Sequence, residues 1–262
     1  FATKGWTDSA SENARKNKLD KGFETFMQQE DLNVSLVGVC DLFDVRAEQG
    51  IDASTNEVRP GGKPLESATR YRYHEELLKN DKIDAVIIAT PDHWHAQIAM
   101  DAANAGKHVY CEKGLTRTFD EAIDLYDTVK RTGITFQLGH QNRQVEANEK
   151  AKQIIKQGLL GDVNLVELAT NRNSPWGAWV WDIHPEGNSK TIDWDTFQKP
   201  APNKIDFGEE ALKRFFRWRC WYDYGTGLSG DLLSHDFDAI NQIMGLGIPK
   251  YASSSGGIYY YK

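Results

Sequence analysis

Two short motifs bring together residue types that can do chemistry. Residues 89–95 read ATPDHWH, and residues 111–114 read CEKG. Two histidines followed by a glutamate and a lysine could bind a metal ion, form a catalytic cluster or simply end a buried strand. On a helix, His93 and His95 are two positions apart and point in different directions, so a shared ion is disfavoured. We therefore predict no metal site and expect one imidazole to lie near a cofactor.

A second pattern, Asp231-x-x-x-His235-x-x-Asp238, lies in a segment with apolar residues at helical spacing, residues 229–247. Positions i, i+4 and i+7 share one helical face, so Asp231 and His235 are expected within hydrogen-bond reach. A carboxylate that orients and charges an imidazole makes a general base that works near neutral pH. The alternative is an exposed helix face with an acidic residue near the helix N-terminus.

Two further charged residues are predicted at strand ends. Asp41 ends the apolar run at residues 34–41, and Lys113 ends the run at 107–113. In a dinucleotide-binding sheet, the acid that ends the second strand binds the adenosine ribose and repels a 2′-phosphate, which favours NAD over NADP. A glycine-rich turn should precede such an acid, but no G-x-G-x-x-G occurs upstream of Asp41. The alternatives are an acid that merely ends a strand and a solvated lysine.

Alternating strands and helices must hold these side chains. Short apolar runs predict strands at residues 34–41, 83–91, 107–113 and 134–141. Helix-like segments that end before a glycine lie at residues 92–105, 118–132 and 145–157. Strands that are apolar on both faces and alternate with helices indicate a parallel sheet covered by helices. We predict a doubly wound α/β domain over residues 1–145, in which the chemical residues lie at one edge of the sheet.

The composition changes near residue 160. Residues 161–170 read as a strand, and six of the eight tryptophans lie between Trp176 and Trp221. Such a long stretch without a clear period is more typical of a functional or interface excursion than of a core element. Residues 256–262 look like a strand cut short. We assign residues 146–262 to a second domain, which we expect to be incomplete.

The overall composition excludes several kinds of partner. The formal net charge of −7 and the pI of about 5.5 argue against nucleic acid and anionic membranes, because both need a basic face. No apolar run reaches about 18 residues, so no membrane span is predicted. The three cysteines are odd in number and unrelated in spacing, which fits a reducing compartment or buried thiols.

The start of the sequence bears on where the protein works. The first residue is Phe1 rather than methionine, so a leader could precede it. We expect a cytoplasmic protein, or a periplasmic or otherwise exported one if a leader is present. We also expect the intact gene product to be longer, with the first strand and the glycine-rich turn that this sequence lacks.

The motifs together resemble a known family. Residues 83–115, IDAVIIATPDHWHAQIAMDAANAGKHVYCEKGL, are similar to the Thr-Pro-Asn/Asp-x-x-His turn and the following Glu-Lys-Pro of the glucose-fructose oxidoreductase / inositol dehydrogenase / MocA-like family. Residues 225–245, GTGLSGDLLSHDFDAINQIMG, resemble its D-x-x-x-H-x-x-D helix. The stretch at residues 191–227 is similar to one branch of the family, so the resemblance covers nearly the whole chain.

The resemblance implies a Rossmann domain followed by an α+β domain with a large, mostly antiparallel sheet. It implies an NAD-dependent enzyme that oxidises a hydroxyl of a sugar, cyclitol or glycoside and forms a homo-oligomer, a dimer or tetramer. Matched by position, the catalytic residues are Lys113, Asp231 and His235. The cofactor contacts are Asp41, Thr90, Pro91, His95, Glu112 and Lys113. Gly114 stands where the family usually has proline, which leaves the backbone beside Lys113 less restrained.

The tryptophan-rich stretch supplies candidate substrate contacts, namely Trp176, Trp218 and Arg219. Aromatic rings can stack on sugar faces, but core or subunit packing is the alternative, because aromatic residues dominate interfaces too. Two other functions stay open. One is a glycoside lyase or hydrolase that oxidises its substrate transiently with bound NAD, and the other is a non-catalytic family member that serves assembly.

Overall fold

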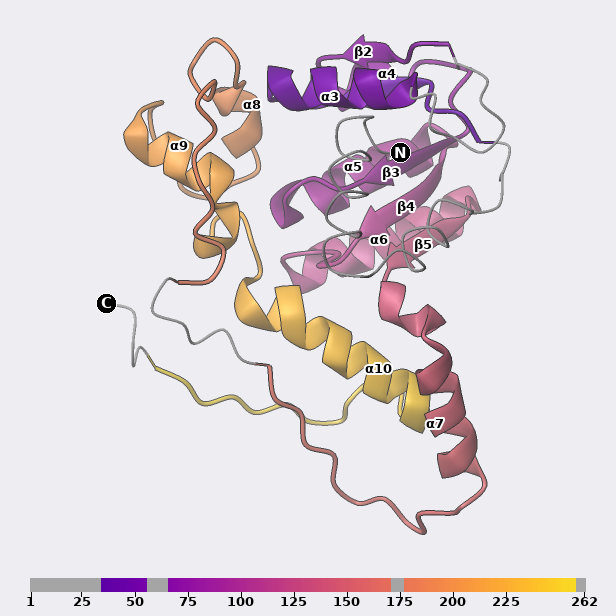
Figure 1. Ribbon diagram of the computed structural model, residues 1–262. Coiled ribbons are helices and arrows are strands. Elements are labelled where there is room, and N and C mark those ends of the chain that lie inside the picture. The colour runs from indigo at the N-terminus through magenta and orange to yellow at the C-terminus, as the bar shows by residue number, and fades with distance from the viewer. Residues whose placement is uncertain (1–33, 56–65, 171–176, 258–262) are drawn as a thin grey trace, which may run out of the picture. The chain divides into compact units, whose positions relative to one another are not determined.

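The structure is a computed structural model that describes residues 34–55, 66–170 and 177–257 (Figure 1). The described residues form two compact units. The first unit holds those up to residue 84 together with 184–197, and the second holds 85–183 and those from residue 198 on. The division into domains at residue 145 stays a prediction.

The first unit contains a two-stranded parallel sheet, in which β1 (Gly38–Cys40) pairs with β2 (Thr69–Tyr71). The described part of this unit has the helices α3 (Asp44–Ser54), α4 (His74–Leu77) and most of α8 (Trp194–Gln198). Phe43 is 1% exposed and forms an isolated antiparallel bridge with Ile192, which joins the later segment to the end of β1. The sequence prediction of a strand that ends at Asp41 is therefore confirmed within a residue or two.

The second unit contains a three-stranded parallel sheet in the order β3 (Ala85–Ile88), β4 (His108–Glu112) and β5 (Phe136–Gly139). α5 (Asp92–Asn104) follows β3 and α6 (Phe119–Thr132) follows β4, so each helix is a crossover between parallel strands. α5 packs on β3 and β4 through a row of buried small residues, which lets the helix approach the sheet closely. These elements confirm the predicted parallel sheet with helices on it, a Rossmann-like arrangement.

The remaining elements of the second unit are helical. They are η1 (Gln141–Gln144), α7 (Glu146–Lys156), α9 (Glu209–Phe216), η2 (Trp218–Cys220), η3 (Ser229–Leu233) and α10 (Ser234–Met244). η3 is a π-helical turn that runs directly into α10, and α10 packs along α7 (Figure 1). Gly245 ends α10 in the left-handed region at φ 67°, as the glycine after a helix predicts. The predicted helix at 229–247 is confirmed, with a π-helical start that was not predicted.

One predicted strand is wrong. Residues 161–170 form no strand in the structure, and their apolar side chains face solvent, with Leu165 71% exposed. An apolar pattern favours a strand, but a strand needs a neighbour to bind its backbone N–H and C=O groups. No antiparallel sheet occurs in the described ranges, so the large sheet of the second domain stays a prediction. Of the predicted terminal strand, residues 258–262 lie outside the described residues, and 256–257 are not in a strand.

Two further findings concern membrane-spanning helices and the cysteine thiols. Within the ranges given above, no helix has both the length and the apolar character that crossing a bilayer demands. The three cysteines, Cys40, Cys111 and Cys220, are free thiols in the structure. Burial raises the pKa of Cys111 to about 12, so this thiol is protonated at neutral pH.

Candidate functional site

The three strands of the second unit lead into polar side chains at their carboxyl ends. Thr90 follows β3, Lys113 follows β4 and His140 follows β5. Because the strands are neighbours in one parallel sheet, their carboxyl ends meet at one edge, where open α/β sheets bind ligands. We call this edge, together with the residues of η3 and α10 that contact it, the candidate site.

An ion pair joins the candidate site to the π-helical turn. The ammonium Nζ of Lys113 donates to the Oδ1 of Asp231 at 2.7 Å and to the backbone oxygen of Asp231 at 2.7 Å. The side chains of Lys113 and Asp231 are 13% and 9% exposed, so solvent screens the pair little. The structure therefore brings together two residues that the sequence separates by 118 positions.

A second cation holds the same carboxylate. The Nε of Arg219 donates to the Oδ1 of Asp231 at 3.1 Å, and its guanidinium lies 4.1 Å from the centre of the Trp218 ring. Burial opposes ionisation of Asp231, but the hydrogen bonds from Lys113 and Arg219 outweigh it and lower the pKa of the carboxyl. Arg219, a predicted substrate contact, thus belongs to the same cluster as the predicted catalytic residues.

His235 lies in the candidate site but not where the helical spacing predicts. The described residues contain no hydrogen bond between Asp231 and His235, and the buried Nδ1 of His235 has no partner there. The physical reason is the π-helical turn of η3, since its i→i+5 bonding changes the angle between positions four apart. Lys113 and Arg219 both bind the Oδ1 of Asp231, and in the described residues His235 donates to neither carboxylate oxygen, so the expected carboxylate–imidazole pair is not formed.

His140 is a site residue that the sequence analysis missed. Its ring lies 5.8 Å from the ring of His235, edge to face at 86°, and its Nδ1 is also buried without a partner in the described residues. Burial lowers the pKa of His140, and the charges of Lys113 and Arg143 act in the same direction while Asp238 opposes them. The available signal was its position, because it ends a predicted strand as Lys113 does.

Sequence comparison gives the family. Residues 21–140 match the model of the oxidoreductase family with an NAD-binding Rossmann fold, the glucose-fructose oxidoreductase / inositol dehydrogenase / MocA-like family. This stretch of the chain belongs to the family. The match includes the candidate-site residues that follow β3, β4 and β5, and it confirms the resemblance, the Rossmann part of the predicted fold and NAD as the cofactor of the family.

Two curated relatives and one solved structure illustrate the range of the family. The levoglucosan dehydrogenase of Pseudarthrobacter phenanthrenivorans is 30% identical over 191 residues, which are 69% of this chain and 40% of that protein. The alpha-N-acetylgalactosaminidase of Shewanella oneidensis is 29% identical over 63% of this chain and 34% of that protein. An oxidoreductase domain protein from Kribbella flavida superposes with a TM-score of 0.52 at 23% identity, over 80% of this chain and 45% of that one, and shows the fold.

The chain spans 40% or less of the length of these two curated relatives. The family match therefore concerns the NAD-binding fold at residues 21–140 and does not extend to the whole protein. The activity, the substrate and the partners of the whole protein are matters for proposals.

Two observations fit NAD as the cofactor of this family member. The hydroxyl Oγ1 of Thr90 is buried and has no hydrogen-bond partner in the part of the chain that the structure describes. In the first unit, Asp41 follows β1 and uses only its Oδ1, which accepts from the backbone N–H of Phe43 at 2.8 Å. Burial raises the pKa of Asp41, and the Phe43 N–H opposes that shift. Its second oxygen accepts no hydrogen bond within the described residues, and the binding of a ribose diol by Asp41 stays a prediction.

The other predicted cofactor contacts of this family member have different places in the structure. Pro91 is the N-cap of α5, and Glu112 is the last residue of β4. His95 is 1% exposed, and its two ring nitrogens lie 2.8 Å from the backbone oxygen of Gly114 and 2.7 Å from that of Thr90. Both ring nitrogens are therefore bonded within the protein, and a contact between His95 and the cofactor stays a prediction. Instead His95 ties the end of β3 to the residue after Lys113.

The aromatic candidates for substrate binding lead to two outcomes. Trp176 lies outside the described residues. Trp218 is half-buried, with the Arg219 guanidinium over its ring and Gly225 so close that a Cβ there would lie 3.3 Å from the ring. Packing thus takes up much of this ring, and sugar stacking on it stays a prediction.

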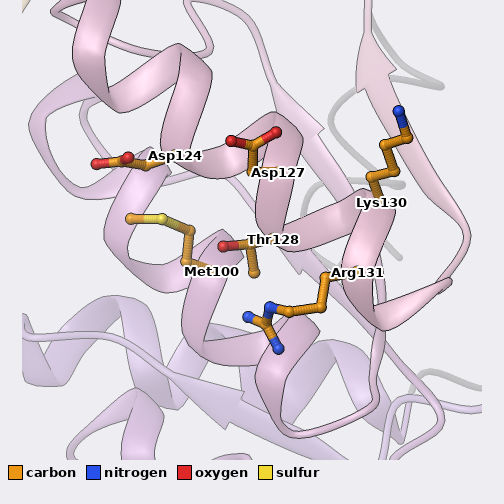
Figure 2. Close-up of a pocket in the computed structure, with 6 residues that line it drawn as sticks. All are labelled: Met100, Asp124, Asp127, Thr128, Lys130 and Arg131. Atoms are coloured by element: carbon orange, nitrogen blue, oxygen red, sulfur yellow. The ribbon is translucent and has the colours of Figure 1, made fainter.

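Two other features of the structure carry no site. A hollow of about 640 Å³ lies between α5 and α6, lined by Met100, Asp124, Asp127, Thr128, Lys130 and Arg131 (Figure 2). None of the predicted site residues lines it. In residues 34–55, 66–170 and 177–257, no group of three or more His, Cys, Asp or Glu side chains is arranged to hold a metal ion.

Proposed function

We propose that the protein is an NAD-dependent oxidoreductase that transfers a hydride between a hydroxyl-bearing carbon of a sugar, glycoside or cyclitol and the nicotinamide ring. The observation that carries the proposal is the buried Lys113–Asp231 pair at the carboxyl end of β4, with His235 on the helix that follows. A buried ion pair is costly in stability unless it is well bonded, so its position at the ligand-binding edge of the sheet favours a role in chemistry.

Lys113 is proposed to bind the substrate oxygen. An ammonium has three N–H groups, and two of those of Lys113 already bind Asp231. The third is left for the hydroxyl oxygen of the substrate, where it stabilises the negative charge that develops as the C–H bond breaks. Bound NAD supplies the hydride acceptor, and Asp41, Thr90, Pro91 and Glu112 are the residues proposed to hold it.

His235 is proposed to take the hydroxyl proton. Its Nδ1 has no protein partner in the described residues, so one nitrogen can accept a proton from the substrate. General-base catalysis of this kind contributes about 10²–10⁴-fold to the rate. Because Asp231 binds Lys113 and Arg219 rather than His235, we assign to Asp231 the task of holding the ammonium, and not that of orienting the imidazole.

The relatives support a carbohydrate-like substrate. One is called a levoglucosan dehydrogenase, and levoglucosan is a sugar derivative with free hydroxyl groups.

We also propose a homo-oligomeric state, dimer or tetramer, and a cytoplasmic location, or an exported one if a leader precedes the sequence.

A second function is favoured by a separate observation. The relative from Shewanella oneidensis is called an alpha-N-acetylgalactosaminidase, which cleaves a glycoside. The same residues could serve such a reaction if the hydroxyl were oxidised only transiently, because oxidation acidifies the neighbouring C–H bond. Product would then appear without net NADH, whereas a dehydrogenase forms NADH and product in equal amounts.

The test is NADH formation by the full-length protein on a panel of sugars, cyclitols and glycosides, with sugar release measured in parallel. Lys113→Ala and His235→Ala should each lower the rate by about 10²-fold or more. Lys82→Ala, which removes an exposed lysine far from these residues in the sequence, is the matched control and should keep the rate. Near wild-type rates in both site variants would contradict the proposal, and product without NADH would favour the second function.

A further inference from the structure

Asp92 is a buried carboxylate whose partner lies far away in the sequence. It is the first residue of α5 and 3% exposed, yet it makes no side-chain bond to cap its own helix. Its Oδ2 accepts from the backbone N–H of Thr226 at 3.0 Å and from the Thr226 hydroxyl at 2.7 Å, across 134 positions of sequence. The acid after β3 is thus bonded to the segment that carries Asp231.

Thr226 stands directly ahead of the helix of the candidate site. The chain is helical from residue 227, continues through η3 and ends with α10, and it carries Asp231 and His235. A carboxylate bonded to the N–H just before a helix both binds a free donor and complements the positive end of the helix dipole. Asp92 therefore fixes the start of a helix other than its own.

Gly114 fits against the same threonine. A Cβ at position 114 would lie 3.1 Å from the Thr226 hydroxyl and 3.6 Å from the Oδ2 of Asp92, closer to the hydroxyl than most real contacts. On its other side, the backbone oxygen of Gly114 lies 2.8 Å from the Nδ1 of His95. The residue after Lys113 is thus held between His95 and Thr226, although it lacks the ring of the proline that is usual there.

These contacts join the backbones of the two residues in the ion pair. Gly114 follows Lys113, and Gly230, which precedes Asp231, packs so closely on Thr226 that a Cβ at position 230 would overlap the Thr226 side chain. The Lys113 ammonium reaches both the carboxylate and the backbone oxygen of Asp231 at 2.7 Å, so a small shift of either backbone would lengthen two hydrogen bonds at once.

We propose that Asp92 and Thr226, packed against Gly114, are positioning residues that set the place of the Lys113 ammonium. We call these three residues the lock. The inference rests on the proposed function for its catalytic meaning, but the position of Lys113 can be measured without a substrate. These three residues also explain how Lys113 is held at the end of β4 although glycine, and not proline, follows it.

The experiment measures the acetylation of Lys113 by acetic anhydride in the full-length protein, by mass spectrometry. Exposed Lys82 is the internal reference, and buried Lys107, 9% exposed, reports general opening of the fold. The Nζ of Lys113 is bonded to Asp231 twice and the side chain is 13% exposed, so the reagent reaches it poorly and it is labelled slowly. The variants are Thr226→Val, which removes the hydroxyl at equal size, and Thr226→Ser, which keeps it.

Thr226→Val should raise Lys113 labelling about tenfold relative to Lys82, because the buried Asp92 carboxylate loses the Thr226 hydroxyl, one of its two hydrogen-bond donors. Thr226→Ser should restore most of the protection, and Asp231→Asn gives the rate with the pair broken. Labelling in Thr226→Val that stays within about twofold of the wild type, while Asp231→Asn is labelled fast, would overturn the proposal. A parallel rise at Lys107 would overturn it too, because it would mean general loosening of the fold.

Two further variants keep the proposal testable if Thr226→Val does not fold. Asp92→Asn keeps the shape of the side chain but weakens both bonds, and Gly114→Ala pushes a methyl group against the hydroxyl. Both should raise Lys113 labelling, and unchanged labelling in both would overturn the proposal. On the substrate found with the panel, the same variants should lower kcat more than they raise KM. Absence of any NADH formation would instead reject the proposed function and leave the labelling result unaffected.

Discussion

Asp44 in the first unit and Asp231 in the second have the same local arrangement in different surroundings. In each case, one carboxylate oxygen receives hydrogen bonds from two basic side chains. At Asp44 these are Arg70 and Arg72, the latter at 2.7 Å, and the side chains are about one-third exposed, at 28% for the acid and 35% and 33% for the arginines. Water and salt screen such a cluster, so it contributes little to stability.

The cluster at Asp231 lies deeper. Asp231 is 9% exposed and Lys113 13%, while Arg219 is 33% exposed. In both clusters the basic side chains lower the pKa of the acid against the opposing effect of burial. The same hydrogen bonds therefore have different consequences: at Asp44 they link side chains on a solvated surface, and at Asp231 they keep a charged carboxylate in a buried position where an unpaired charge is costly.

The largest expected difference is in activity. Asp231→Asn should lower the rate of NADH formation by about 10²–10³-fold, because the Lys113 ammonium loses the carboxylate that holds it. Asp44→Asn should change the rate by less than about twofold, since a screened surface cluster does not touch the reacting atoms. Rates of the two full-length variants on the substrate found with the panel provide the measurement. Equal losses in both would mean that the depth of the cluster does not matter.

The next difference is in stability. Lys113→Met leaves the buried Asp231 with one cation instead of two and should lower the free energy of unfolding by about 3 kcal/mol. Arg72→Met makes the matched change at Asp44 and should cost about 0–1 kcal/mol. Urea unfolding followed by circular dichroism compares the two. A larger loss for Arg72→Met than for Lys113→Met would reverse the comparison.

A third difference lies in the pH range over which each region acts. Burial lowers the pKa of His140 below 6.5, so the unfolded chain binds a proton more readily than the folded protein does. The stability from neutral His140 is therefore fully present above about pH 6.5 and is lost as the pH falls through the lower pKa of the folded protein. The stability that comes from the lowered pKa values of Asp44 and Asp231 is present above about pH 3.8 and is lost as the pH falls below it.

His140→Gln tests this assignment. It should flatten the dependence of unfolding free energy on pH just below 6.5 and leave the acid-side dependence in place. Urea unfolding of the variant and the wild type at a series of pH values measures both ranges. An unchanged slope below 6.5 in the variant would assign that slope to another group.

Local patterns in the sequence predicted the strands and helices of the Rossmann-like part well. The apolar runs at 83–91, 107–113 and 134–141 correspond to β3, β4 and β5, because short apolar runs between helix-like segments predict the strands of a parallel sheet, although β3 is open on one side, where Ile87 is 71% exposed. Lys113 could be placed at the ligand-binding edge for the same reason. His140 could have been found by the rule that placed Lys113.

Contacts between distant segments could not be predicted in this way. An acid at the start of a helix commonly caps that helix, but the partner of Asp92 is Thr226, and nothing in the sequence around either residue indicates the other. The Asp231–His235 spacing assumed an α-helix, whereas η3 is π-helical. The strand predicted at 161–170 has the right pattern but no neighbour in the described residues. Each case depends on a partner that lies far off in the sequence or on a local irregularity.

The smallest expected difference is the response to salt, which tests directly whether burial shields the Asp231 cluster from solvent more than the Asp44 cluster. The Debye length falls from about 10 Å at 0.1 M to about 3 Å at 1 M ionic strength, so added salt weakens exposed pairs and affects buried ones much less. Double-mutant cycles at low salt and at about 1 M NaCl should show the Arg72–Asp44 coupling energy shrink by a few tenths of a kcal/mol, while that of Lys113–Asp231 stays nearly constant. Equal salt sensitivity would mean that water reaches both carboxylates alike, and the larger effects expected for the Asp231 cluster would then need a cause other than burial.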